Sequence, residues 1–364
     1  MKAFVAIDSF KGSLSTFEAA AAVREALDGQ EVVCFPMSDG GEGFCDVVES
    51  YLEGERVSVK VSGPFGTPVE AAYFIAGRTA YIESAAACGY TLAPKDPFKA
   101  TSYGLGSIIA DAAQRGVDRI VVGLGGTCTV DAGVGMLQAL GAQFRLKDGS
   151  LLPEKGPALL GDIVRIDLSR LQRPAARLEI WSDTEAPMYG RRGAAYLYGR
   201  QKGLSDSDIP AADAWLRRLA RLYPGRVWLR RGYGAAGGIA AALASVLGAR
   251  MCRGAEEIIA LSGLRERLFG IRPDILVTGE GKFDRQTLTG KLPSRIAAAG
   301  AECRRRTGVP KTLCFAGKVE PARTSLFEAV IPITPEGTPE DEALRPDVAE
   351  ENLKAAVRKT LLSL

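Results

Sequence analysis

The sequence contains no histidine, and this absence excludes more chemistry than any other feature of its composition. Catalytic triads and dyads that use histidine, histidine general bases, phosphohistidine relays and histidine-ligated zinc or iron sites are all excluded. Any catalysis must therefore rely on carboxylates, lysine, arginine, hydroxyls, thiols, backbone amides or an oxygen-ligated metal.

Cysteine is present, but not in a pattern that binds metal or builds a disulfide scaffold. The seven cysteines are odd in number, scattered and never spaced as C-x-x-C, which argues against zinc ribbons and disulfide frameworks. No apolar run approaches the ~18 residues that a membrane span needs, and the apolar run 3–7 is too short for a signal segment. We therefore expect a cytoplasmic protein with reduced thiols and no membrane partner.

The charge is nearly balanced, with 46 basic and 43 acidic side chains and a net charge of +3. Without a long basic stretch, a nucleic-acid partner has no electrostatic support. The 364 residues are 46% hydrophobic and 24% charged, which is ordinary for a globular protein of one large or two smaller domains. Glycine is the exception, because 42 are present where the usual ~7% would give about 25. Many positions therefore need a positive φ or a close approach to a ligand.

Several segments repeat one order: a short apolar run, a loop of Gly, Asp, Ser or Thr, and then a helical pattern. The predicted strands are residues 2–7, 31–35, 119–123, 178–181, 274–278 and 311–315. A capping box at Ser15 and Glu18 predicts a helix to about Leu27. Strands that alternate with helices predict an α/β protein with mostly parallel sheets, in which ligands bind beyond the carboxyl ends of the strands.

The sequence pattern changes between residues 56 and 81, where alternating valines and a Gly-Pro-Phe-Gly turn predict an antiparallel meander. We interpret this change as the start of an inserted domain. The prediction is a discontinuous α/β domain of residues 1–62 and 233–364, with a second, mixed α/β domain of residues 63–232 inserted into it.

The familiar phosphate-binding motifs are absent: there is no G-x-x-x-x-G-K-[ST] and no complete G-x-G-x-x-G. What remains are glycine-rich loops with an acid and a nearby lysine or hydroxyl, strongest at 39–43, 125–135 and 279–284. This mixture suits phosphoryl transfer, because amides and lysines neutralise phosphate oxygens while carboxylates hold magnesium or orient a hydroxyl. A binding protein without turnover has similar loops, and Gly and Asp are also ordinary turn residues.

Seven motifs resemble, in the same order, those of the bacterial glycerate kinase family. They are residues 8–15, 38–43, 101–104, 135–141, 201–203, 234–238 and 278–281, and the resemblance runs from about Met1 to Val319. It implies two unlike α/β domains, one flavodoxin-like with a parallel sheet and one with a mixed sheet. It also implies phosphoryl transfer from ATP to D-glycerate, giving phosphoglycerate, with the 2-phospho product favoured.

The chain departs from this family's motifs at Asp96, Val130 and Ala186, where relatives carry asparagine. Losing an amide removes hydrogen bonds, and Asp96 adds an anion near a site for an anionic substrate. A kinase for a longer sugar acid is therefore an alternative. The alternative from another class is a non-catalytic binder of acidic or phosphorylated metabolites.

With histidine absent, Asp131 is our first choice for the carboxylate that orients or deprotonates the substrate hydroxyl. Lys11 and Lys291 are expected to contact phosphates or the substrate carboxylate. The candidate ligands of Mg²⁺, or contacts to hydroxyls, are Asp39, Glu42, Glu280 and Asp284. The candidate substrate- and nucleotide-binding residues are Asp8, Ser9, Gly12, Ser13, Gly40, Gly41, Gly125, Gly126, Thr127, Asp183, Gly279, Gly281 and Lys282. We expect a monomer or homodimer that uses ATP and Mg²⁺.

Overall fold

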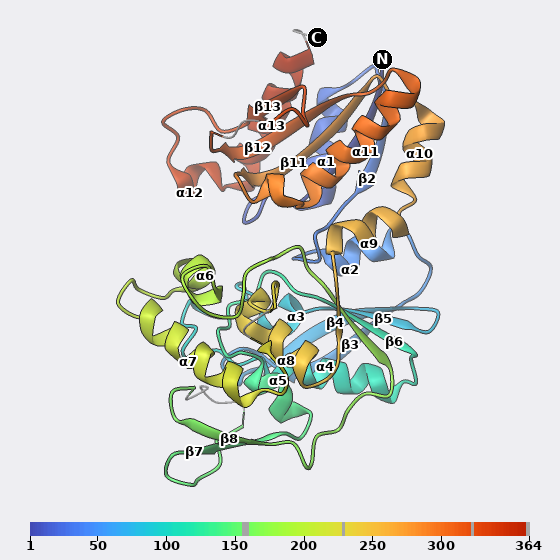
Figure 1. Cartoon of the computed structure of the whole chain (residues 1–364). Helices are drawn as coiled ribbons and strands as arrows, with labels where there is room; N and C mark the ends of the chain where they lie inside the picture. Colours follow the sequence, from blue (N-terminus) through green and yellow to red (C-terminus); the bar gives the residue numbers. More distant parts are fainter. Residues whose placement is uncertain (155–159, 228–229, 322–323, 362–364) are drawn as a thin grey trace. The chain divides into compact units, whose positions relative to one another are not determined.

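The computed structural model describes residues 1–154, 160–227, 230–321 and 324–361 (Figure 1). The chain divides into two compact units. Unit 1 is Met1–Asp39 together with Ala255–Leu364, and unit 2 is Gly40–Gly254. Among the described residues, no helix is both long and apolar enough to cross a membrane.

Unit 1 contains a five-stranded sheet, parallel throughout, in the order β13-β12-β11-β1-β2. The strands are β1 (Lys2–Ile7), β2 (Glu31–Pro36), β11 (Ile275–Phe283), β12 (Lys311–Val319) and β13 (Ala329–Pro332). Counted along the chain within the unit, their order is 2-1-3-4-5, which is the flavodoxin-like arrangement. The order reverses at β1, so the switch point, where such sheets bind ligands, lies between β1 and β11.

Helices cover both faces of this sheet, which explains why β1 is apolar at nearly every position. The helices are α1 (Thr16–Ala26), α9 (Gly254–Leu261), α10 (Leu264–Ile271), α11 (Leu292–Thr307), α12 (Glu340–Ala343) and α13 (Pro346–Leu361), with the short 3-10 helix η3 (Thr287–Thr289). On one face, Val5 packs in a core with α1 and α13. On the other face, Ala297 of α11 packs with Cys314 of β12. The predicted capping box is confirmed: Ser15 N donates to Glu18 Oε2 over 2.8 Å, and Glu18 N donates to Ser15 Oγ over 3.2 Å.

Unit 2 contains a six-stranded mixed sheet in the order β10-β9-β6-β5-β4-β3. The strands are β3 (Glu55–Ser62), β4 (Pro68–Ala76), β5 (Thr79–Glu83), β6 (Arg119–Gly123), β9 (Arg177–Trp181) and β10 (Arg250–Cys252), and β7 (Gln143–Leu146) and β8 (Ile163–Asp167) form a separate antiparallel pair. β5, β6, β9 and β10 are parallel, whereas β3 and β4 are antiparallel. The predicted meander is confirmed, and so is the α/β class with one parallel and one mixed sheet.

The helices of unit 2 also cover both faces of its sheet. They are α2 (Phe44–Glu49), α3 (Ala85–Cys88), α4 (Tyr103–Gln114), α5 (Val134–Ala139), α6 (Ala194–Lys202), α7 (Ile209–Leu222) and α8 (Ile239–Ser245), with the 3-10 turn η2 (Ala235–Gly238). One face packs Ile120 and Ile180 into the large core that includes Ile108 of α4. On the other, Phe44 of α2 packs edge-on against Trp181, with ring centroids 5.5 Å apart.

The two units divide the chain after Asp39 and after Gly254, whereas the sequence led us to expect boundaries near residues 63 and 232. The difference comes from two strands at the margins of the predicted insertion. β3 pairs with β4 along its whole length, and the three-residue β10 pairs with β9. Both strands are thus part of the mixed sheet.

A buried carboxylate in the sheet of unit 2 is surrounded by arginines. Glu179 is 0% exposed and accepts hydrogen bonds from Arg119 and from Arg250, the latter over 3.0 Å. Arg177 is a third cation, 3.2 Å from the carboxylate. Burial alone raises the pKa of Glu179, but the bonds and charges of Arg119 and Arg250 outweigh burial and bring it below its ordinary value.

We predict that Glu179→Gln lowers the free energy of unfolding by about 1.5–3 kcal/mol, because the buried side chain loses its charge-assisted hydrogen bonds to Arg119 and Arg250. Since the pKa of Glu179 is lowered on folding, the lost stability is present above the unfolded pKa and disappears as pH falls through the folded pKa. Urea unfolding at pH 7 and pH 3.5 measures both effects. The exposed Glu31→Gln, which removes a surface ion pair with Lys2, is the control. Equal stability of the two variants at pH 7 would contradict the prediction.

Candidate active site

Carboxylates gather at the switch point of unit 1. Asp8 directly follows β1, and Glu280 lies in β11, the strand beside it. Burial raises the pKa of Asp8 well above its ordinary value, and the negative charges of Asp39 and Glu280 raise it further, while Lys11 opposes them. Four residues predicted from three motifs, Asp8, Lys11, Asp39 and Glu280, therefore interact electrostatically in the folded unit.

Glu280 is 7% exposed, and its surroundings are specific. Thr287 Oγ1 donates to Glu280 Oε1, and Lys291 Nζ lies 4.0 Å from Glu280 Oε2. Burial raises the pKa of Glu280 to about 7, although Lys291 and Thr287 favour the ionised form. Among the described residues, the buried hydroxyl of Thr278, two positions before Glu280 on the same strand, has no hydrogen-bond partner. Such a carboxylate and hydroxyl are suited to a polar ligand.

The donors of this cluster fit magnesium, which prefers carboxylate and phosphate oxygens. The negative charges of Asp39 and Glu280, which raise the pKa of Asp8, also favour a cation. Within the part of the chain that the structure describes, however, no three acidic or cysteine side chains lie close enough together to hold a metal ion. The predicted metal ligands Asp39, Glu280 and Asp284 lie in unit 1, whereas Glu42 lies in unit 2.

The other predicted residues of unit 1 have mixed surroundings. Ser13 Oγ donates to Phe10 O, and Ser9 N donates to Asp8 Oδ1, so both stabilise the turn after β1, in which Gly12 has φ +82°. Gly279 and Gly281 flank Glu280 in β11. Asp284 Oδ1 accepts from Gln286 N over 2.7 Å, so it caps the turn before η3. Lys282 forms an exposed ion pair with Glu320 over 2.7 Å.

In unit 2, the predicted glycines lie where backbones meet. A Cβ at Gly125 would lie 2.3 Å from the Cα of Gly41, and a Cβ at Gly40 would lie 2.5 Å from the carbonyl oxygen of Trp181. No other residue fits such contacts, so the packing of loops 40–43 and 123–126 accounts for these glycines without a ligand. Ligand binding by them stays a prediction.

Glu83 is a buried carboxylate of unit 2 that our list of candidates lacks. It accepts hydrogen bonds from Gly43 N over 3.2 Å and from Cys45 N over 3.5 Å, at the start of α2. Burial raises its pKa to about 7, and Asp46 and Glu42 add to the rise. From the sequence, Glu83 could equally be a helix-terminal charge, and the structure shows that it caps α2.

Asp131 is 1% exposed, and its carboxylate is fully engaged. Oδ2 accepts from Ser102 N (2.8 Å), Ser102 Oγ (2.7 Å) and Gly135 N (3.2 Å), and Oδ1 accepts from Gly133 N over 3.0 Å. These bonds cap α5 and attach the segment before α4 to it. The predicted role as a base stays a prediction, and the structure adds this structural role.

A lysine from another element, which our sequence reasoning did not select as a site residue, also contacts the loop after β6. Lys202, at the end of α6, is 3% exposed and donates to Thr127 Oγ1 over 3.0 Å and to Thr129 O over 2.8 Å. The signal was the Gln-Lys-Gly motif at 201–203, but nothing local shows that its lysine points to a loop more than seventy residues away. Asp183, half-buried after β9, lies just beyond Ser182, whose N donates to Cys252 O.

The positions that depart from the family's motifs are not alike. Val130 and Ala186 are both buried, and Val130 belongs to the hydrophobic core of unit 2. Asp96 is half-buried and pairs with Lys99 over 2.9 Å, and the hydrogen bond from Lys99 lowers its pKa. An apolar residue at 130 is therefore explained by packing, whereas the negative charge of Asp96 is partly neutralised.

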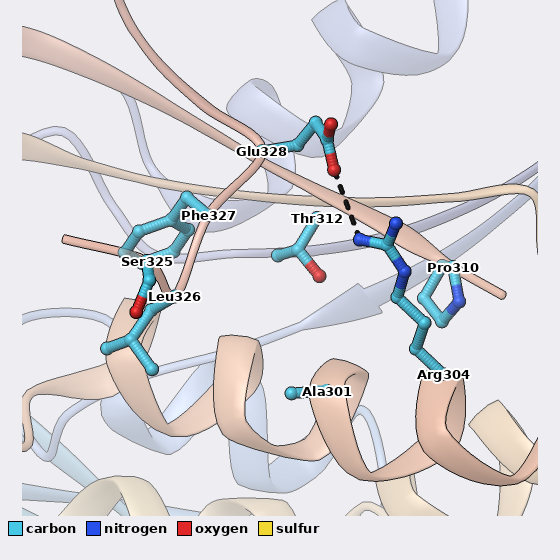
Figure 2. Close-up of a pocket in the computed structure, with 8 residues that line it drawn as sticks. All are labelled: Ala301, Arg304, Pro310, Thr312, Ser325, Leu326, Phe327 and Glu328. Carbon is cyan, nitrogen blue, oxygen red and sulfur yellow. Dashed lines mark hydrogen bonds and ion pairs between the residues drawn. The ribbon is translucent and has the colours of Figure 1, made fainter. Parts of the chain in front are cut away.

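A hollow with an empty volume of about 360 Å³ lies elsewhere in unit 1 (Figure 2). Its lining residues are Ala301, Arg304, Pro310, Thr312, Ser325, Leu326, Phe327 and Glu328. Pro310 and Thr312 are at the amino end of β12, so this hollow lies at the end of the sheet opposite to Asp8 and Glu280. Arg304 and Glu328 form an ion pair over 3.1 Å there. We do not assign the reaction to it, since ligands of such sheets bind at the carboxyl ends.

The whole chain matches a known family: the model of the glycerate kinase family aligns with residues 3–363. The chain belongs to the glycerate kinase family. The resemblance seen in the motifs is thereby confirmed, and it extends past Val319 to include β13 and α13. Both the switch-point cluster and the Asp131–Lys202 region lie inside the matched residues.

Individual members of the glycerate kinase family are similar over most of their lengths. A protein of Halalkalibacterium halodurans named "Glycerate kinase" is 34% identical over 360 residues, covering 94% of this chain and 93% of that protein. The "Glycerate 2-kinase" of Escherichia coli is 36% identical over 313 residues, covering 82% and 81%. A crystal structure of a putative glycerate kinase 2 from Salmonella typhimurium LT2 has 34% identity and a TM-score of 0.73, covering 100% of this chain and 98% of that one.

We predict that Asp131→Asn loses about 1–3 kcal/mol of stability, because its amide nitrogen would face backbone N–H donors. Thermal unfolding and kcat are measured on the same preparation. A fall in kcat of about 10²–10⁴ in protein that is still folded would support the base role in addition. Asp148→Asn, whose amide oxygen can still accept from Ser150 at an exposed turn, is the control. An unchanged melting temperature would contradict the structural role.

The pKa of Glu280 predicts a pH dependence of stability. Because this pKa is raised from 4.5 to about 7, the folded protein favours the neutral acid, and that stability is full below the unfolded pKa and lost as pH rises through about 7. Between pH 5 and pH 8 the wild type should therefore lose about 2–3 kcal/mol more than Glu280→Gln. Chemical unfolding over this range measures the difference. Parallel curves would show that Glu280 is already ionised when folded.

Proposed function

We propose that the chain is an ATP-dependent kinase that phosphorylates D-glycerate to phosphoglycerate, with 2-phosphoglycerate the favoured product. The observation that carries the proposal is the family match over residues 3–363. The E. coli relative named for the 2-kinase reaction, 36% identical, supports the position of the phosphoryl group. In this reaction the substrate hydroxyl oxygen bonds to the γ-phosphorus, the bond from phosphorus to ADP breaks, and the hydroxyl proton passes to a base.

In unit 1, the switch-point cluster supports phosphate and metal chemistry. Lys11 and Lys291 would face phosphate oxygens as compact positive charges. Asp39 and Glu280 would hold Mg²⁺ through carboxylate oxygens, with Asp284 next to Glu280. When bound, the metal neutralises negative charge on the phosphates. Asp8 would help to orient the residues that hold the metal and the phosphates, because its carboxyl group interacts electrostatically with Asp39, Lys11 and Glu280.

In unit 2, the loop after β6 supports recognition of the hydroxy acid. Thr127, Asp131 and the glycines of residues 125–135 are proposed to contact or shape the substrate. Asp131 is the proposed acceptor of the hydroxyl proton, through a change in its hydrogen bonds, and this is the step that the Asp131→Asn kinetics examine. Asp183, at the end of β9, is a further proposed contact.

A kinase for a longer sugar acid is the second candidate, and the residues at 96, 130 and 186 favour it. Substituting asparagine by Val130 or Ala186 leaves fewer hydrogen-bond donors for a small acid. The third candidate, a binder of acidic metabolites without turnover, differs from both because it releases no ADP.

We predict that the purified protein releases ADP with D-glycerate only when a divalent cation is present. A coupled ADP assay with D-glycerate, threonate and erythronate, run with Mg²⁺ or with excess chelator, measures this, and phosphorus NMR assigns the product. The highest kcat/KM should be that for D-glycerate. A higher value for threonate or erythronate would favour the longer-acid kinase, and no release with any acid would favour the binder. Turnover that persists in excess chelator would refute the metal requirement.

A further inference from the structure

Lys202 is a buried lysine with two specific hydrogen-bond acceptors, and no role has been assigned to it above. It ends α6, and Gly203 after it has φ +105°, so the helix stops with this lysine at its C-terminus. Its ammonium donates to two neutral oxygens of one loop, Thr127 Oγ1 and Thr129 O. Burying an ammonium group costs free energy. The two bonds offset part of this cost, and they restrain the loop because they join residues 127 and 129 to the end of α6.

The restrained loop has an unusual backbone. Ala132 has φ +57° and Gly133 has φ +77°, and Ala132 lies against a second left-handed turn at Ala236, Gly237 and Gly238. Ala132 N donates to Gly237 O over 3.0 Å, and a Cβ at Gly237 would lie 2.1 Å from Thr129 O. A residue other than glycine in this conformation costs about 1–3 kcal/mol and persists only where its surroundings enforce it. Lys202 is part of those surroundings.

One group in the loop lacks a partner. Thr129 is 0% exposed, and its Oγ1 has no hydrogen-bond partner among the described residues. A buried hydroxyl left unsatisfied is rare in folded proteins, and a polar atom bound there would satisfy it. Lys202 binds the carbonyl oxygen of this same residue, so the lysine fixes the point from which the hydroxyl extends.

We propose that Lys202 is a positioning residue for the hydroxy-acid substrate: it holds the loop of residues 127–133, which contains the left-handed Ala132 and Gly133, so that Thr129 meets an oxygen of the acid. This inference rests on the proposed function. Lys202 acts through the loop and does not itself take part in phosphoryl transfer. Its loss should therefore weaken binding of the acid more than binding of ATP.

Lys354 is a matched control, because it is also a buried lysine, 6% exposed, but in unit 1. Its ammonium lies within 3.2 Å of Glu25, Glu350 and Glu351 and ties α13 to α1. Lys202→Met and Lys354→Met make the same chemical change at two buried sites. A loss that is only structural should lower the melting temperature in both variants and leave KM unchanged.

The experiment compares steady-state kinetics and amide hydrogen exchange in the wild type, Lys202→Met, Lys354→Met and Thr127→Val. We expect Lys202→Met to raise KM for D-glycerate about tenfold or more, with KM for ATP within about twofold, which corresponds to losing one or two hydrogen bonds. Thr127→Val removes one acceptor of the lysine and should raise the same KM by less, and Thr127→Ser should restore it. Exchange in residues 127–133 should speed up in Lys202→Met but not in Lys354→Met.

Unchanged KM for the acid in both Lys202→Met and Thr127→Val would overturn the proposal. If Lys202→Met does not fold, amide exchange of residues 127–133 in Thr127→Val decides the question: this variant removes one acceptor of Lys202, so faster exchange supports the restraint and unchanged exchange overturns the proposal. If the wild type turns over none of the acids, the proposed function fails, and exchange then tests the restraint alone. Faster exchange of the loop in Lys202→Met would support that restraint, and unchanged exchange would overturn it.

Discussion

Repulsion between buried carboxylates is the constraint on which the chemistry of unit 1 depends. Burial raises the pKa of Asp8 and of Glu280, and the negative charges of Asp39 and Glu280 raise that of Asp8 further, because the fold brings the ends of β1 and β11 together. A protein tolerates such repulsion when cations relieve it, and Lys11 and Lys291 do so only in part. The same excess of negative charge gives a divalent cation with a polyphosphate a reason to bind. Without histidine, carboxylates with raised pKa values, such as Glu280 at about 7, carry titratable chemistry near neutral pH.

In unit 2, by contrast with the carboxylates of unit 1, the main buried charged groups have hydrogen-bond or ion-pair partners within the protein. Glu179 has three arginines, Asp131 accepts four hydrogen bonds, and Lys202 donates to two oxygens of one loop. The bonds of Asp131 and Lys202 hold the loop that contains the left-handed Ala132. Among the described residues of unit 2, the buried Oγ1 of Thr129 and the Nε of Arg119 lack hydrogen-bond partners.

What the sequence predicted well was local. The strand 2–7, the capping box at Ser15 and the meander after residue 56 were correct, because spacing and cap chemistry act within a few residues. The three-residue β10 has no such pattern and forms because β9 offers an edge. The surroundings of Asp131 and Lys202 depend on Ser102 and Thr127, far away in the chain. The sequence predicted a ligand at Gly40 and Gly125, which stays a prediction, and the structure supplies backbone packing as a sufficient cause for both glycines.

The division of unit 1 between the two ends of the chain affects how the protein folds during synthesis. β1 leaves the ribosome long before its neighbour β11, and at ~5–20 residues per second the delay is on the order of 15–50 s. Unit 2 is continuous, from Gly40 to Gly254, and so can fold first. During the delay β1 can pair with β2, but the edge of β1 that later pairs with β11 stays open, and its apolar side chains are exposed. Nascent chains of this protein should therefore depend on chaperones that shield β1, and stalled translation before residue 275 should yield aggregation from the N-terminal segment while unit 2 is already compact.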